Sequence, residues 1–203
     1  MSELTIGIII GSVREKSESA RIGAYVAARL RALEPEISIE MFDLRTLSVP
    51  LWHEDKWTAG SEMQSFWKPL STRLKTCDGF VVISPEWAGM APAHLKNFLL
   101  MCDGGELAHK PAQLISISSG MGGAYPVAEL RMSGYKNNFL MWLPDHMVLR
   151  QVASLFASET PTPLDVELTA RMDYGLAFLT ETAKALGPVR NRLQNIKLYK
   201  TGM

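Results

Sequence analysis

Short, nearly continuous apolar runs alternate with amphipathic stretches along this chain. Isoleucine fills most of residues 4–10 without polar alternation, which is typical of a strand buried on both faces of a parallel sheet. Runs of the same kind recur at residues 79–84 and 112–118. Residues 37–43 alternate apolar with polar side chains, and residues 145–152 form a further, partly apolar stretch. The pattern therefore predicts five strands.

Between these strands, apolar side chains recur at the spacing of helices. In the first such stretch they include Ile22, Val26 and Leu30, and Ser19 is placed to cap its start. Residues 44–61 show no clear periodicity and predict a long loop. The predicted helices cover residues 20–33, 62–76, 92–102, about 124–138 and 162–186, the last ended by Gly187 and Pro188.

Strands that alternate with helices, without an internal repeat or a linker, predict an α/β fold with a doubly wound parallel sheet. A chain of 203 residues fits one such domain. We expect this domain over residues 1–188, followed by a basic C-terminal tail at 189–203 that carries Arg190, Lys197 and Lys200. Such sheets bind ligands at the carboxyl ends of their strands. With strand order 2-1-3-4-5, the loops after the first, third and fourth strands are neighbours.

The loop after the first strand carries polar chemistry suited to an anion. Ser12, Arg14, Ser17 and Ser19 follow Gly11 within eight residues, just before a predicted helix. Hydroxyls, backbone N–H groups and a helix N-terminus favour phosphate, and an arginine fork can grip its oxygens. The alternative is an ordinary strand-to-helix turn with polar filling.

The other two loops differ from simple connections. Residues 85–90 place an aromatic side chain beside proline and glycine, and residues 118–123 are rich in serine and glycine, which exposes backbone. A flat heteroaromatic ligand with a phosphate tail fits the three loops together. The glycine pattern of the standard dinucleotide fingerprint is absent after the first strand.

Composition narrows the class of partner. The formal net charge is zero, so no nucleic-acid or anionic-membrane partner is expected. Cys77 and Cys102 lack metal-binding spacing and are expected to be small buried residues. No apolar run is long enough for a transmembrane helix and no secretory signal is visible. A cytoplasmic protein without a metal centre is expected.

Three motifs resemble those of the NADPH-dependent FMN reductases, a family of flavodoxin-like fold. They are GSVREKSES at residues 11–19, PEWAGMAPAHLKN at 85–97 and SSGMGG at 118–123. The resemblance implies FMN as cofactor and NADPH or NADH as co-substrate. Trp87 stands where the family has Tyr, and Ala88 stands where it has Asn.

Carried over position by position, the resemblance implies three groups of cofactor-binding residues. The groups are Ser12, Arg14, Ser17 and Ser19 for the phosphate; Pro85, Glu86, Trp87 and Gly89 along the isoalloxazine; and Ser118, Ser119 and Gly120 closing the ring site. Glu86 also has a second interpretation, as an acid at the start of a helix.

The favoured function is an FMN-dependent NAD(P)H oxidoreductase that passes electrons through flavin N5 to a small acceptor, with ping-pong kinetics. Quinones, azo compounds, nitroaromatics and metal oxyanions are candidate acceptors. The flavin carries the chemistry, so no catalytic side chain is expected. A flavodoxin-like electron carrier and a flavin-free scaffold or regulatory module are the alternatives.

A homodimer or homotetramer is also expected. Trp52 and Trp57 in the 44–61 loop, together with the helix after Pro92, would leave a large apolar patch on a monomer.

Overall fold

A five-stranded parallel sheet forms the centre of the computed structural model, which describes residues 4–193. The strand order β2-β1-β3-β4-β5 confirms the predicted flavodoxin-like, doubly wound arrangement. Every residue of β3 and β4 is buried, as expected for central strands covered on both faces. The strands are β1 (Thr5–Ile10), β2 (Ser38–Asp43), β3 (Gly79–Pro85), β4 (Pro111–Ile117) and β5 (Met141–Leu149).

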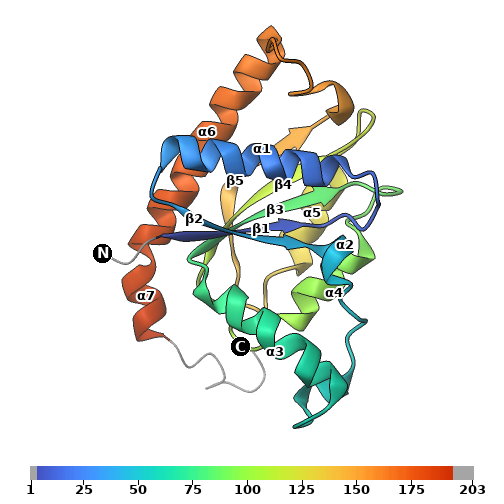
Figure 1. Cartoon of the computed structure of the whole chain (residues 1–203), viewed down its shortest axis with the longest axis vertical. Helices are drawn as coiled ribbons and strands as arrows, with labels where there is room; N and C mark the ends of the chain where they lie inside the picture. Colours follow the sequence, from blue (N-terminus) through green and yellow to red (C-terminus); the bar gives the residue numbers. More distant parts are fainter. Residues whose placement is uncertain (1–3, 194–203) are drawn as a thin grey trace.

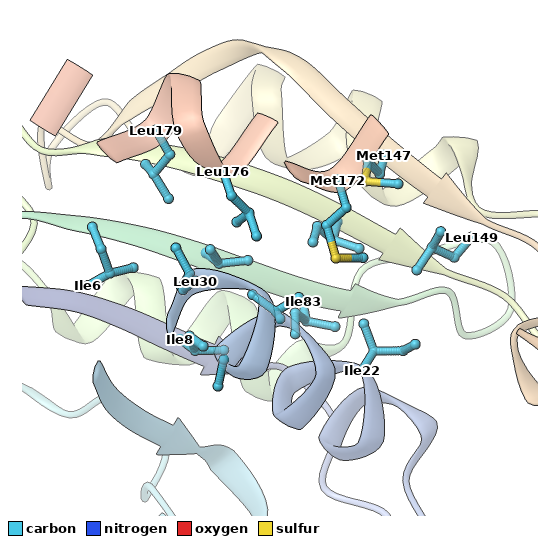
Figure 2. Close-up of a cluster of buried hydrophobic side chains, with 14 of the residues drawn as sticks. Ile6, Ile8, Ile22, Leu30, Ile83, Met147, Leu149, Met172, Leu176 and Leu179 are labelled. Atoms are coloured by element: carbon cyan, nitrogen blue, oxygen red, sulfur yellow. The ribbon is translucent and has the colours of Figure 1, made fainter. Parts of the chain in front are cut away.

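Helices cover both faces of the sheet (Figure 1). One face packs against α1 (Glu18–Leu33) and α6 (Pro163–Ala185), and Figure 2 shows the apolar cluster between them. The other face packs against α3 (Glu62–Thr76), α4 (Ala93–Met101) and α5 (Ala124–Ser133). Successive strand residues point to opposite faces, so Ile8 belongs to the first cluster and Ile9 to the second.

The predicted loop at residues 44–61 contains two short helices, α2 (Leu44–Leu47) and the 3-10 helix η1 (Glu54–Trp57). Each of these helices has only four residues, which is too short for a helical pattern of apolar positions to be recognised in the sequence. A second 3-10 helix, η2 (Val152–Ser154), follows β5. The buried Lys56 anchors η1 by donating to the Met101 carbonyl and to the Asp103 carboxylate.

The predicted cap of α1 was wrong by two residues. Ser17 is the N-cap, with extended backbone (φ −114°, ψ 115°), and its Oγ accepts from the Ala20 N–H at 3.4 Å. Ser19 lies inside the first turn and is buried. An N-cap residue needs non-helical backbone, which Ser19 lacks.

Three boundaries near the sheet edge also differ from the prediction. The helix predicted at about 124–138 ends at Ser133, and β5 covers Met141–Leu149 instead of residues 145–152. The edge strand β5 is exposed at several positions and contains Pro144, so its apolar pattern is weak. A register shift beside Ala112 lets this irregular strand pair with β4.

Gly187 and Pro188 were predicted to end the last helix, yet they also begin a new one, α7 (Gly187–Arg192). Proline suits the first turn of a helix, where no N–H is needed. Arg190 of α7 forms an ion pair with Asp78 at 2.6 Å. The division at residue 188 stays a prediction, and Lys197 and Lys200 of the expected tail lie outside the described residues. Across residues 4–193, no helix is both long and apolar enough to span a membrane.

Candidate functional site

The three unusual loops begin at the same edge of the sheet. Ile10 at the end of β1 pairs with Ile83 of β3, and Pro85 at the end of β3 pairs with Ile117 of β4. The predicted proximity of these loops is confirmed by the strand order. Every predicted site residue therefore lies at the carboxyl ends of β1, β3 and β4, where doubly wound sheets bind ligands.

The loop after β1 presents hydrogen-bond donors. Ser12 Oγ accepts from the Arg14 N–H at 3.3 Å, and Ser17 Oγ accepts from the Ala20 N–H. Each hydroxyl retains its own hydrogen to donate. Arg14 is exposed, and within residues 4–193 its guanidinium has neither a hydrogen bond nor an ion pair. The loop thus offers a cation and two hydroxyl donors beside the N-terminus of α1.

Ser19 adds an unusual feature to this loop. It is 1% exposed, and its Oγ has no hydrogen-bond partner in the described part of the chain. A buried hydroxyl without a partner costs about 1–3 kcal/mol. Ser12, Arg14 and Ser17 fit a phosphate-binding loop, whereas the hydroxyl of Ser19 is fully covered by the protein in this structure.

The loop after β3 is a tight hairpin turn. Trp87 and Met90 exchange two backbone hydrogen bonds of 3.0 Å each, and the residues between them, Ala88 and Gly89, have φ of 50° and 74°. Positive φ at both central residues defines a type I′ turn, in which Asn-Gly is the preferred pair. The Asn of the family motif therefore has a backbone reason, and Ala88 occupies a left-handed conformation without that advantage.

Glu86 connects the second loop to the third. Its Oε2 accepts from the N–H of Gly123 at 2.6 Å and from the N–H of Tyr125 at 3.3 Å. Gly123 is the N-cap of α5 and has no side chain to cap it. The carboxylate of Glu86 supplies the missing acceptor and opposes the positive end of the helix dipole. Of its two expected roles, the structure displays the acid at a helix start.

The loop after β4 is tied to the end of β5. Arg150 Nε donates to the carbonyls of Met121 at 2.7 Å and Gly122 at 3.2 Å, and the Gln151 N–H donates to the Gly120 carbonyl at 2.9 Å. Ser118 is half-buried and its Oγ accepts from the Gly120 N–H, whereas Ser119 and Gly120 are exposed. Sequence reasoning missed Arg150, because nothing local marks it as a partner of this loop.

Several large apolar side chains are exposed to solvent at the carboxyl end of the sheet. Met90 is 53% exposed, Met121 72% and Tyr125 68%. Exposed apolar groups gathered at the loops of one sheet edge mark a binding surface. Met121 within the glycine-rich motif and Tyr125 just after it were the available signals, and sequence reasoning passed over both. Among the described residues, no group of three His, Cys, Asp or Glu side chains is placed to hold a metal ion.

Known proteins share this architecture. A solved structure of an oxidoreductase from Corynebacterium diphtheriae superposes with a TM-score of 0.72 at 14% identity, covering 91% of this chain and 99% of the other. The flavoenzyme FerB, an NAD(P)H:(acceptor) oxidoreductase from Paracoccus denitrificans, superposes with a TM-score of 0.65 at 21% identity, covering 90% and 98%. These two similarities show the shared fold.

Sequence comparison shows the family. A curated NADPH azoreductase from a Bacillus species (strain OY1-2) is 23% identical over 182 residues, which cover 89% of this chain and 97% of that protein. The family model described as NADPH-dependent FMN reductase matches residues 4–156, three quarters of the chain and all three loops of the site. The chain belongs to the NADPH-dependent FMN reductase family.

Proposed function

We propose that this enzyme uses NADPH to reduce a small planar aromatic acceptor, a quinone, azo compound or nitroaromatic, in two half-reactions at one face of bound FMN. The family supports the FMN- and NADPH-dependent oxidoreductase, and the name of the Bacillus relative supports an azo acceptor. The acceptor class rests chiefly on the exposed apolar side chains of Met90, Met121 and Tyr125. A metal oxyanion, the remaining expected acceptor, gains nothing from such a surface.

The loop residues fit FMN. Ser12, Arg14 and Ser17 would hold the phosphate. The chain segments 85–89 and 118–120 would hold the ring, partly through the exposed backbone of Ser119. FMN, when bound, supplies hydride acceptance and electron delivery. The protein binds and orients the ring and keeps one face accessible, so its own side chains need not act as acid or base.

One accessible face imposes an order on the two substrates. If NADPH and the acceptor occupy the same space in turn, product must leave before the acceptor binds. Initial rates measured against NADPH at several fixed concentrations of menadione, a small quinone, should then give parallel double-reciprocal lines. Intersecting lines would mean that both substrates bind together and would contradict the shared face.

The two alternative functions make different predictions. An electron carrier requires a protein partner and would oxidise NADPH slowly with free menadione. A flavin-free module would lack the flavin absorption bands near about 370 and 450 nm that a bound flavin cofactor gives. A visible spectrum of the purified protein, followed by NADPH oxidation with and without menadione, separates all three.

We also propose a homo-oligomer. Trp57, Leu100 and Met132 are exposed on η1, α4 and α5, and a groove of about 550 Å³ runs between Trp52, Trp57 and Leu100. A second copy of the chain would cover this apolar surface. Sedimentation of a single 22.5 kDa species at micromolar concentration would contradict the proposal.

A further inference from the structure

Tyr125 stands at the ring end of the site. It is the second residue of α5, and a methyl group built on Gly89 would lie 3.9 Å from its ring carbon Cδ2. The side chain is largely exposed, and within residues 4–193 its hydroxyl makes no hydrogen bond. An aromatic ring is therefore held beside the turn after β3 without being buried by the protein itself.

The position of this ring follows from the strand order. Tyr125 follows β4, whereas the phosphate loop follows β1, and β3 lies between these strands. Two strand spacings of about 4.8 Å each separate the ends of β1 and β4 by on the order of 10 Å. Tyr125 therefore belongs to the end of the site that faces the ring and the acceptor.

The backbone around Tyr125 is fixed by Glu86. The carboxylate accepts from the N–H groups of Gly123 and Tyr125, at 2.6 and 3.3 Å. The approach is close, since a methyl group added to Gly122 would lie 2.4 Å from Glu86 Oε1. The end of β3 thus sets where α5 begins and where the Tyr125 ring emerges.

We propose that Tyr125 is a specificity-determining residue of the acceptor site and that Glu86 is its positioning residue. The Tyr125 ring forms a wall against which a planar aromatic acceptor packs, and Glu86 holds that wall by its two hydrogen bonds to the start of α5. This inference rests on the proposed function and names the residue that favours aromatic acceptors.

Comparing two electron acceptors distinguishes a loss of contact between acceptor and protein from a loss of electron transfer itself. Menadione must pack on the protein, whereas hexacyanoferrate(III) is hydrophilic, has no aromatic face and makes no comparable contact. An aromatic contact contributes about 0.5–1.5 kcal/mol, a twofold to twelvefold effect. Tyr125→Ala should lower the ratio of kcat/KM for menadione to that for hexacyanoferrate(III) about fivefold, within that range. Tyr125→Phe should keep the wild-type ratio, as should the control Tyr174→Ala, which removes an exposed tyrosine of α6.

Binding provides a second readout that does not depend on turnover. The oxidised FMN-loaded protein is titrated with menadione without NADPH, and the flavin absorbance reports the Kd. Tyr125→Ala should raise this Kd about fivefold, in line with a lost aromatic contact. Glu86→Ala and Gly122→Ala should both raise it too, whereas Glu86→Gln, which keeps an acceptor oxygen, should retain most of the affinity. Thermal unfolding of each variant checks that it is folded.

The outcomes separate this inference from the proposed function. If the wild-type protein reduces neither acceptor with NADPH, the proposed function fails. If it reduces both, and Tyr125→Ala changes neither the ratio nor the menadione Kd, the acceptor wall is overturned. If Tyr125→Ala has the expected effect but folded Glu86→Ala behaves as wild type, the positioning role of Glu86 is overturned.

Discussion

The two ends of the sheet differ in whether a cationic side chain has partners within the protein. At the amino end, the buried Lys110 donates through Nζ to the carbonyls of Leu74, Lys75 and Glu106, at 2.9, 3.0 and 2.8 Å. At the carboxyl end, the hydroxyl of Ser19 and the guanidinium of Arg14 have no partner among residues 4–193. The cation at the amino end is satisfied by the protein itself, although Gln113 Oε1 and Trp142 Nε1 near the starts of β4 and β5 have no partner among residues 4–193. At the carboxyl end, the exposed guanidinium of Arg14 is available to a ligand.

Comparing the two ends also shows that a large cavity is not by itself a ligand-binding site. A cavity of about 1020 Å³ lies at the amino end, lined by residues that include Asp78, Lys110 and Arg190. Three of its charged groups are satisfied within the protein: Arg190 pairs with Asp78, and Lys110 donates to three carbonyls. The unpaired guanidinium of Arg14 and the exposed apolar side chains of Met90, Met121 and Tyr125 identify the carboxyl end better than cavity volume does.

Removing the Lys110 side chain should cause the largest loss in the free energy of unfolding, and it should leave FMN binding unchanged. Lys110→Met removes three hydrogen bonds to carbonyls, and although the Leu74 carbonyl still accepts from the Cys77 N–H, the carbonyls of Lys75 and Glu106 lose the Lys110 donor. An unsatisfied buried group costs about 1–3 kcal/mol, so we expect a loss of about 3 kcal/mol in the free energy of unfolding. Urea denaturation measures this change. Lys75→Met, at an exposed neighbour, is the control and should stay near wild type. Loss of FMN affinity in folded Lys110→Met would contradict the separation of the two ends.

Removing the Arg14 side chain should have the opposite effect: it should weaken FMN binding and leave the stability of the FMN-free protein unchanged. Arg14→Ala deletes a charge-assisted phosphate contact and should weaken FMN binding by about 1.5–3 kcal/mol. Stability of the FMN-free protein should be unchanged, because Arg14 has no partner among the described residues. Fluorescence quenching gives the FMN Kd, and Lys16→Ala in the same exposed loop is the matched control. Equal affinities for Arg14→Ala and wild type would make this loop an ordinary turn.

The amino end should also respond to pH. Burial lowers the pKa of Lys110 from 10.5 to about 8, so above pH 8 the unfolded chain keeps a proton that the folded chain releases. The free energy of unfolding should therefore rise with pH, by at most about 1.4 kcal/mol per unit. Denaturation between pH 7.5 and 9 should reveal this rise, and Lys110→Met should remove it.

The rise in the free energy of unfolding with pH should end near pH 9, because the two buried cysteines then act in the opposite direction. Burial raises the pKa of Cys77 from 9.0 to about 12 and that of Cys102 well above 9.0. Above pH 9 the unfolded thiols lose protons that the folded chain keeps, so these groups lower the free energy of unfolding as pH rises. A curve that falls already between pH 8 and 9 would contradict the Lys110 assignment.

The smallest effect concerns backbone strain at the carboxyl end. Ala88 has φ of 50° in a type I′ turn, where asparagine is tolerated better than alanine. Ala88→Asn should therefore raise the free energy of unfolding by about 0.5–1 kcal/mol. Ala88→Val, with a β-branched side chain at the same φ, should lower it. Thermal unfolding of the FMN-free proteins checks both, and destabilisation by asparagine would count against the strain.

The sequence alone determined the strands of the sheet and the cluster of polar residues after β1. Residues 79–84 predict a buried strand because both faces of a central parallel strand are apolar, and that signal is local. Ser12, Arg14 and Ser17 likewise lie within six residues of one another, so their spacing along the chain almost fixes their spacing in space. The fold class could thus be predicted from local patterns, whereas the strand order came from the resemblance to a flavodoxin-like family, and the placement of FMN on these residues stays a prediction.

Tertiary structure decided what each remaining residue does. Glu86 meets Gly123 across 37 positions of sequence, and Arg150 reaches Met121 across 29. The boundaries of β5 depended on its place at the sheet edge, where burial no longer imposes an apolar pattern. Tyr125 looks like any helix residue until the turn at Gly89 is placed beside it. Contacts between distant segments have no local pattern, because they arise only when the strands are assembled side by side.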